Sequence, residues 1–303
     1  MYRSFSVSNF RNFKSLSISD LKRINIIIGK NNTGKTSLLE ALYLHMGCMH
    51  PELTLKLLNF RGIPGSEASA KAIWGSLFYQ YNIDSEITLS ATYPDNTKAN
   101  LSISLQQAPT SLVEIKPPTD GLIEIPEKVT TSAQLPLISE RMLAYKYKHR
   151  STESTRLTSL KLKKSELNLE INPPVTDNPF PGFFIPARTQ LDPSSVARRL
   201  GELQVNRKDK PVVYALRLIE PNLKSLSIIP IGPVSTIHAD TGLTTLLPLQ
   251  LAGEGMTNMS EIIIDIASAP KGIVLIDDIG TGIHYSVLHL FWKVIFKLAV
   301  KLD

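Results

Sequence analysis

The residues best suited to bind a phosphate-bearing ligand lie in the segment Gly29–Thr36. Its spacing matches G-x-x-x-x-G-K-[ST], with Gly29 and Gly34 at the fixed glycine positions. Glycine lets the backbone curl so that several N–H groups point inward, which forms a concavity for oxyanions. Lys35 would add a positive charge beside the outer phosphates, and the Thr36 hydroxyl would coordinate Mg²⁺. We therefore expect this loop to bind a nucleoside triphosphate, ATP with Mg²⁺.

The elements around this loop are those that a phosphate-binding loop requires. The β-branched run Ile24–Ile28 predicts a buried strand, and the apolar spacing in Ser37–Met46 predicts an amphipathic helix. A helix N-terminus favours a phosphate through its free N–H groups and its dipole. This context favours a phosphate site over a glycine-rich turn with a surface lysine. We expect the ligand to contact Gly29, Lys30, Asn31, Asn32, Thr33, Gly34, Lys35, Thr36 and Ser37.

A second candidate position is the pair of acids after the apolar run Ile273–Ile276. A magnesium–phosphate site needs a carboxylate in the metal shell, and we assign that role to Asp277. Asp278 is the candidate general base or water-orienting group for hydrolysis. The alternative interpretation is an aspartate pair that only caps the end of a strand. The presence of the phosphate loop favours the catalytic interpretation.

The segment Ala252–Met256 contains Gly253, Glu254 and Gly255 at the start of a predicted helix. A glycine-flanked helix N-terminus is another possible anion site. The same residues would also make an ordinary loop and helix cap, and the spacing alone leaves both interpretations open.

Composition and charge limit the class of protein. Apolar residues make up 43% and charged residues 20% of the 303 residues, as in ordinary globular proteins. The net charge of +6 allows contact with nucleic acid, although no long Lys/Arg run is present. The only cysteine, Cys48, cannot form an internal disulfide, which favours a reducing cytoplasm. No apolar run is long enough to span a membrane, and Met1–Phe13 has no signal-peptide core.

The pattern along the chain predicts an α/β protein in three parts. Residues 1–50 hold the phosphate loop, and residues 182–303 return to strand and helix around a second buried strand. Residues 51–181 have the alternation and turn signals of antiparallel strands with some helix, inserted into the nucleotide domain. The remaining predicted elements are strands at Tyr2–Val7, Ser15–Ile18, Ile87–Tyr93, Leu101–Leu105, Leu122–Ile125, Gly182–Ile185, Leu223–Ile229, Thr244–Leu249 and Gly272–Ile276, and helices at Ser194–Leu203, Val212–Ile219, Met256–Ala269 and Tyr285–Val300.

Four segments, in this order, resemble the ABC-type ATPase heads of the RecF, SMC and OLD group, and most closely the bacterial AAA-family ATPases of the OLD-like kind. They are Ser8–Lys14, similar to the N-terminal strand motif; Ile26–Leu42, similar to the P-loop and its helix; Gly253–Met256, placed like the signature motif; and Ile276–Leu288, similar to the Walker B strand and D-loop. The resemblance implies an ABC-type head: a P-loop NTPase with a mixed central sheet, an antiparallel β insertion and a helical subdomain.

The resemblance also implies a homodimer with ATP held between two subunits. Gly253–Gly255 would then face the γ-phosphate of the partner's ATP. Gly280–His284 would be the D-loop, which places His284 near the nucleotide, and Gln190 is the nearest candidate for the Q-loop. DNA repair or phage defence is the process that the resemblance suggests, with nucleic acid or an effector protein as a further partner.

Three departures from the family pattern bear on catalysis. Asp278 stands where the family usually has a catalytic glutamate, and Gly280 stands where it has a further acid. The chain also stops at Asp303, where the family continues into a strand that ends in a switch histidine and, in OLD proteins, into a Toprim nuclease. These departures predict slow hydrolysis and a truncated or split product. The rival hypothesis is a non-hydrolysing ATP-binding switch, or a fragment, that controls a partner.

Overall fold

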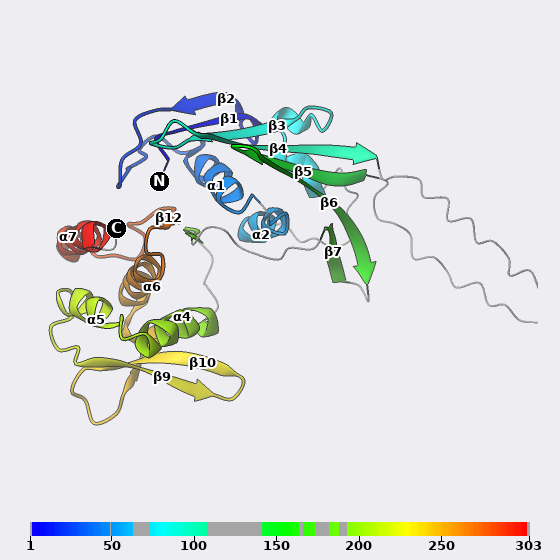
Figure 1. Ribbon diagram of the computed structural model, residues 1–303. Coiled ribbons are helices and arrows are strands. Elements are labelled where there is room, and N and C mark those ends of the chain that lie inside the picture. Colours follow the sequence, from blue (N-terminus) through cyan, green and yellow to red (C-terminus); the bar gives the residue numbers. More distant parts are fainter. Residues whose placement is uncertain are drawn as a thin grey trace, which may run out of the picture.

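The protein is an α/β molecule built on two hydrophobic clusters, shown in a computed structural model in Figure 1. The N-terminal cluster joins a large antiparallel sheet to two helices. The C-terminal cluster joins four helices to a small antiparallel sheet. The structure describes residues 2–48, 50–62, 73–107, 141–163, 166–173, 182–187 and 193–301.

All neighbours in the large sheet are antiparallel, and its strand order is β2-β1-β3-β4-β5-β6-β7. Strand β1 pairs with β3 in a register that places Val7 opposite Leu89. The antiparallel strands predicted for the middle of the chain therefore extend the sheet that the N-terminal strands begin. The strands are β1 (Ser4–Phe10), β2 (Phe13–Ile18), β3 (Ile87–Thr92), β4 (Lys98–Gln107), β5 (Arg141–His149), β6 (Thr152–Lys163) and β7 (Glu166–Asn172).

Helices α1 (Lys35–Met46) and α2 (Leu53–Phe60) cover one face of this sheet (Figure 1). Nine of the twelve residues of α1 are buried. Ala41 and Leu44 have no exposed surface, and each fully buried leucine contributes roughly 1.5–3 kcal/mol through the apolar area it removes from water. The predicted helix after the phosphate loop is confirmed, and it is a core element rather than a surface one.

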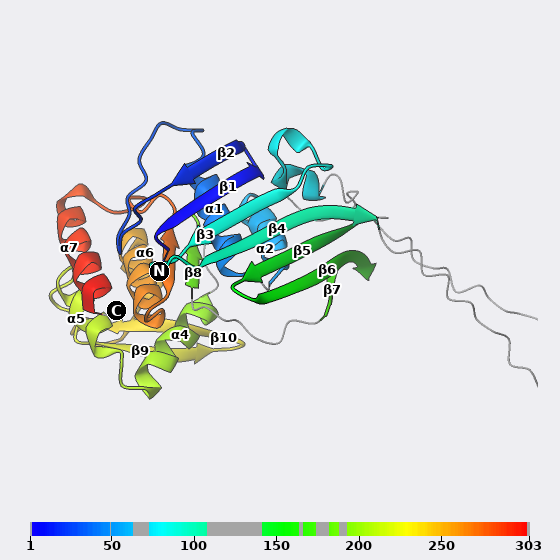
Figure 2. The same cartoon turned by 45° about the horizontal axis from the view of Figure 1, so that its top comes forward.

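The last third of the chain forms the C-terminal cluster, which Figure 2 shows on the opposite side of α1 from the large sheet. Strand β10 pairs with β9 and β11, and α4 packs between β10 and α6. Each strand and helix predicted for this region has a counterpart, but the strand predicted at Thr244–Leu249 covers only Leu247–Pro248, and the strand Val234–Asp240 was not predicted. The elements of this region are β8 (Gly182–Ile185), α4 (Pro193–Val205), α5 (Lys210–Arg217), β9 (Ser225–Ile231), β10 (Val234–Asp240), β11 (Leu247–Pro248), α6 (Glu254–Ser268), β12 (Ile273–Ile276) and α7 (Tyr285–Lys301).

The parallel pair β12–β8 lies between the two clusters. Its register places Ile273 opposite Gly182 and Ile276 opposite Ile185. Side chains alternate across a strand, so Leu275 packs into the N-terminal cluster while Ile276 packs against the C-terminal one. Burial on both faces explains why β12 is a continuous apolar run rather than an alternating one.

The prediction of a buried strand at Ile24–Ile28 is wrong for this structure. The segment is not assigned to a strand, and Ile26 and Ile28 are 60% and 86% exposed. Within the described ranges, no other strand forms a backbone hydrogen bond with it. β-branched residues favour strands, but a strand also needs a neighbouring strand to accept and donate its backbone hydrogen bonds. Strand β12 does not provide one here, because it pairs with β8.

Two further expectations about the sheets have different outcomes. A mixed central sheet was predicted, whereas parallel and antiparallel pairs occupy separate sheets in the part of the chain that the structure describes. The predicted strand at Leu122–Ile125 lies outside the described residues.

No helix among those described has the length and apolar character that a membrane crossing requires.

Candidate nucleotide-binding site

Within the loop Gly29–Thr36, the glycine just before helix α1 cannot be replaced by another residue without strain. Gly34 has a φ of +97°, which side-chain-bearing residues rarely adopt. A Cβ atom there would lie 2.6 Å from both Asn12 Nδ2 and Phe13 Cζ. The backbone conformation and the close approach of the turn after β1 therefore both require glycine at this position.

Helix α1 begins directly after Gly34 with free N–H groups. No side chain caps this N-terminus, and no acidic residue lies in the first turn. Its unpaired N–H donors and its dipole are therefore available to an anion. Ser37 is buried in the first turn. These features are the ones that a phosphate-binding helix N-terminus needs.

The Lys35 side chain folds back across the loop. Its ammonium donates to the carbonyl oxygens of Gly29 at 2.7 Å and Lys30 at 2.8 Å. The Thr33 hydroxyl also donates to the Lys30 carbonyl, at 2.8 Å. The loop thus closes on itself through one lysine, and the charge of Lys35 is held where a bound phosphate would approach the N-terminus of α1.

Thr36 and Asp277 meet, although 241 positions separate them in the chain. The Thr36 hydroxyl donates to Asp277 Oδ2 at 2.8 Å. Helix α1 positions the threonine, and Asp277 follows β12, where its backbone N–H donates to Ile185 O of β8 at 2.9 Å. The two predicted metal-side groups therefore share one position between the two clusters.

The donor set at this position fits Mg²⁺. Mg²⁺ prefers oxygen ligands and usually takes only one or two from the protein, with phosphate and water oxygens completing its shell. The Thr36 hydroxyl and the Asp277 carboxylate are two such oxygens, within hydrogen-bonding distance of each other. No cluster of three or more His, Cys, Asp or Glu residues occurs in the described ranges, so this site would depend on the nucleotide for its remaining ligands.

Asp278 lies at the turn that follows Asp277. It is exposed and has a φ of +54°, a left-handed conformation that is uncommon for residues other than glycine. Its carbonyl accepts a hydrogen bond from the Thr281 N–H at 3.0 Å. This turn takes the chain away from β12, next to the position of Thr36 and Asp277. Ten other described non-glycine residues share a positive φ, so this conformation does not distinguish Asp278, and its catalytic role stays a prediction.

The predicted signature and D-loop segments contact each other. A Cβ on Gly255 would lie 2.5 Å from the carbonyl oxygen of Gly282, so the two backbones are in close contact. Asn258 Nδ2 donates to the Thr281 carbonyl at 3.2 Å. Gly253 has a φ of +100° and open space where a Cβ would stand. These contacts join the start of α6 to the loop before α7, and none of them involves Gly29–Thr36.

Glu254 is the first residue of α6, and it makes this N-terminus different from that of α1. A carboxylate in the first turn already interacts favourably with the helix dipole. This N-terminus therefore already carries a negative charge, unlike that of α1.

His284 does not lie at the loop Gly29–Thr36. His284 is exposed; its Nδ1 lies 2.8 Å from the Ser286 hydroxyl, and its ring packs on that of Tyr285 with centroids 4.4 Å apart. Nothing in the described part of the chain links it to Gly29–Thr36. Gln190 lies outside the described residues.

Comparison with known proteins decides the family. The family model described as the AAA ATPase domain matches residues 1–179, which is more than half of the chain. The chain belongs to the AAA ATPase domain family. The matched residues include the whole of Gly29–Thr36 and α1, the part of the candidate site that is formed by consecutive residues.

Individual relatives of this AAA ATPase are more distant. An ATP/GTP phosphatase of Helicobacter pylori is 23% identical over 310 residues, covering 97% of this chain and 80% of the relative. The DNA replication and repair protein RecF of Idiomarina loihiensis is 54% identical over 41 residues, or 14% of this chain and 12% of RecF.

Among solved structures, the SMC head bound to the C-winged helix domain of ScpA matches with a TM-score of 0.48 and 9% identity, covering 99% of this chain and 87% of that one. Relatives named RecF thus occur among the similar proteins, as the sequence motifs predict.

The structure of this AAA ATPase also reveals a buried charged group beside the site that local sequence patterns do not predict. Glu40 of α1 is 1% exposed and accepts hydrogen bonds from Arg11 Nε at 3.0 Å and Arg61 Nε at 2.7 Å. The hydrogen bond to Glu40 is the main reason that the pKa of Arg61 is raised, and the charge of Asp277 adds to the effect. Arg11 lies within the N-terminal motif, but Arg61 has no local signal, because only folding brings α2 to α1.

Proposed function

We propose that this AAA ATPase binds Mg·ATP at Gly29–Thr36 and hydrolyses it. The observation that carries the proposal is the hydrogen bond between Thr36 and Asp277, which joins the two predicted halves of the site at 2.8 Å. The free N-terminus of α1 and the charge of Lys35 support the binding of phosphate at the same place.

Each residue has a definite part in this reaction. The backbone N–H groups of the loop and Lys35 hold the phosphates and stabilise the negative charge that develops on the transferred group. Thr36 and Asp277 would hold the magnesium ion, which supplies further charge neutralisation when it is bound. Asp278, exposed at the turn after Asp277, orients the attacking water and accepts its proton.

We further propose that two copies assemble around the nucleotide, each presenting Gly253–Gly255 to the ATP of the other. Open space beside Gly253 and the 72% exposure of Leu251 support an approach by a second molecule at this loop. The RecF relatives, named for DNA replication and repair, and the +6 net charge support action on DNA in repair as the biological role. A cytoplasmic location and a role in phage defence remain hypotheses that no relative named here supports.

The first test of nucleotide binding compares two lysines of the same loop. Lys35→Ala should weaken ATP binding by more than about 100-fold, because it removes the charge beside the outer phosphates. Lys30→Ala is the matched control and should change the affinity by less than about threefold, since only the backbone carbonyl of Lys30 takes part in the loop. Calorimetric titration with ATP and Mg²⁺ measures both variants. Equal affinity for ATP in wild type and Lys35→Ala would contradict the proposal.

A second test separates hydrolysis from switching. Asp278→Asn should leave ATP affinity unchanged and remove phosphate release, because the variant side chain no longer accepts a proton from water. Phosphate release and ATP-dependent dimerisation are measured together, the latter by light scattering. Dimerisation by a wild-type protein that releases no phosphate would favour the rival function, an ATP-binding switch, which the aspartate at position 278 favours.

Substrate and DNA binding need measurements of their own. The relative from Helicobacter pylori is named for both ATP and GTP, so GTP should be compared with ATP in the phosphate-release assay. Binding to DNA should weaken steeply as salt is raised, because phosphate contacts release counterions. Absence of any salt-sensitive DNA binding would remove nucleic acid from the proposed partners.

A further inference from the structure

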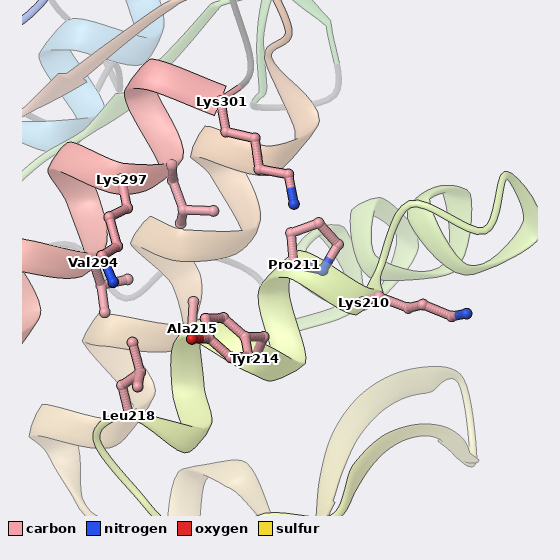
Figure 3. A pocket seen from close by; sticks show the side chains of 9 residues that line it. Lys210, Pro211, Tyr214, Ala215, Leu218, Val294, Lys297 and Lys301 are labelled. Atoms are coloured by element: carbon pink, nitrogen blue, oxygen red, sulfur yellow. The ribbon is translucent and has the colours of Figure 1, made fainter.

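A groove of about 300 Å³ lies between α5 and α7, away from the nucleotide site (Figure 3). It contains none of the residues of Gly29–Thr36, Gly253–Gly255 or the Asp277–Asp278 pair. Its volume is at the lower end of the range for small-molecule sites. The residues that line it are Lys210, Pro211, Tyr214, Ala215 and Leu218 from α5 and its end, and Val294, Lys297, Leu298 and Lys301 from α7.

The floor of the groove is apolar and formed by the core. Ala215, Val294 and Leu298 are each at least 95% buried, so the floor is a fixed surface of the C-terminal cluster. Tyr214 stands at the side with 59% of its surface exposed. An apolar body placed in this groove would remove both the floor and one face of Tyr214 from water, which favours binding.

The rim of the groove carries three lysines and no acid. Lys297 and Lys301 are one helical turn apart on α7, and Figure 3 shows Lys301 extending from α7 toward Pro211 of α5. Lys210 lies at the start of α5. In the part of the chain that the structure describes, the ammonium groups of these three lysines form no ion pair and no side-chain hydrogen bond. Neither α5 nor α7 contains an aspartate or a glutamate within its bounds; the N-cap of α5 is Asp209, next to Lys210, so the uncompensated positive charge of the rim lies with the two lysines of α7.

We propose that this groove binds a small amphipathic anion, a molecule with a short aliphatic or aromatic body and a single carboxylate or phosphate head. The apolar body would occupy the floor over Ala215 and Leu298. The head would remain at the rim, where Lys297 and Lys301 supply the opposite charge. A neutral molecule would lose this attraction, and a cation would be repelled by all three lysines.

Octanoate is a suitable probe, because it has the proposed chemistry and stays monomeric at millimolar concentrations. Titration into the full chain, labelled with ¹⁵N, should give saturable shifts of amide signals from α5 and α7, with a Kd of about 1 mM for a ligand of this size. Octanol should bind about tenfold more weakly, and octylamine should give no saturable shift. Octyl phosphate is titrated in parallel, so that the stronger of the two anions identifies the preferred head group.

Charge reversal on α7 provides the matched control. The double variant Lys297→Glu/Lys301→Glu should weaken octanoate binding by at least about tenfold. Lys293→Glu changes an exposed lysine of the same helix that does not line the groove, and it should change the Kd by less than about twofold. All of these lysines are exposed, so the variants should fold. Absence of saturable octanoate binding, or an equal loss with Lys293→Glu, would overturn the proposal.

Discussion

Helices α1 and α6 both begin at a glycine with a positive φ near 100° and without a side-chain cap, yet they prepare the site in different ways. Helix α1 has a buried body, no acid in its first turn, and Lys35 as its first residue. Helix α6 begins with Glu254 and is in contact with the loop before α7. The first N-terminus is ready for phosphate by itself, whereas the second already holds a negative charge. The difference agrees with the proposal that ATP binds at α1, whereas contact of α6 with a second subunit stays a proposal.

The two helices are also anchored by different buried carboxylates. On α1, Glu40 is held by two arginines that come from β1's turn and from the end of α2. On α6, Asp265 has a single arginine, Arg199 of α4, whose Nε lies 2.6 Å from Asp265 Oδ1 without the alignment of a hydrogen bond. Burial outweighs the attraction to Arg199, and it raises the pKa of Asp265 to about 6. We therefore expect α1 to be anchored more strongly than α6.

The largest predicted effect is on the anchor of α1. Glu40→Ala should lower the free energy of unfolding by about 3–5 kcal/mol, because Arg11, 7% exposed, would keep a buried charge without its partner. Urea denaturation followed by circular dichroism measures this change. Arg198→Ala, which breaks an exposed ion pair with Glu202, is the control and should cost less than about 1 kcal/mol. Similar losses for the two variants would show that Glu40 is not an anchor.

The second prediction compares the leading glycines. Gly34→Ala should cost about 2–4 kcal/mol and abolish ATP binding, because the new methyl group would contact Asn12 and Phe13 and distort the loop. Gly253→Ala has the same need for a positive φ but open space around it, so it should cost only about 1–2 kcal/mol and leave ATP binding by the monomer intact. Urea denaturation and calorimetric titration distinguish the two. An equal loss of ATP affinity in both variants would contradict the separate roles of α1 and α6.

A third, smaller effect is expected at the anchor of α6. Asp265→Ala should lower the free energy of unfolding by about 1–3 kcal/mol at pH 8, less than Glu40→Ala, because the Asp265 carboxylate is itself unfavourably buried. Arg199 would retain its contact with the Phe183 ring, whose centroid is 5.1 Å from the guanidinium carbon. Denaturation curves for the two variants under one buffer give the comparison. A loss at Asp265 larger than that at Glu40 would reverse the expected order.

The smallest effect has a defined pH dependence. Burial, with a smaller contribution from the charge of Asp265, raises the pKa of Glu261 from 4.5 to about 7. The folded state therefore holds a proton that the unfolded state releases between about pH 4.5 and 7, and stability falls as the pH rises through this window. Glu261→Gln should stabilise the protein at pH 8 by about 1 kcal/mol, after allowance for partial exposure, and have little effect at pH 4.5. Thermal unfolding at both pH values measures the change. A stabilisation of the same size at pH 4.5 would contradict a titration at Glu261.

Sequence patterns predicted the local parts of the site well. The loop Gly29–Thr36, its helix and the strand that leads to Asp277 each have their signal within a few consecutive residues, and each element is present apart from Ile24–Ile28. Local sequence patterns did not predict the backbone contact between Gly255 and Gly282, or the ion pairs of Glu40 with Arg11 and Arg61. Their partners come from distant segments, and no local spacing records which segments will pack together.

The sequence by itself determined that this chain carries the spacing of a phosphate-binding loop, because the glycine, lysine and threonine of that pattern would act through the backbone geometry and charge of adjacent residues. The tertiary structure decided how that loop is completed. It brought Thr36 to Asp277 across 241 positions, placed Glu40 between Arg11 and Arg61, and left Ile24–Ile28 exposed. Local patterns indicate which chemistry a side chain can perform. The residues that it contacts are decided by how strands and helices that are distant in the sequence pack together.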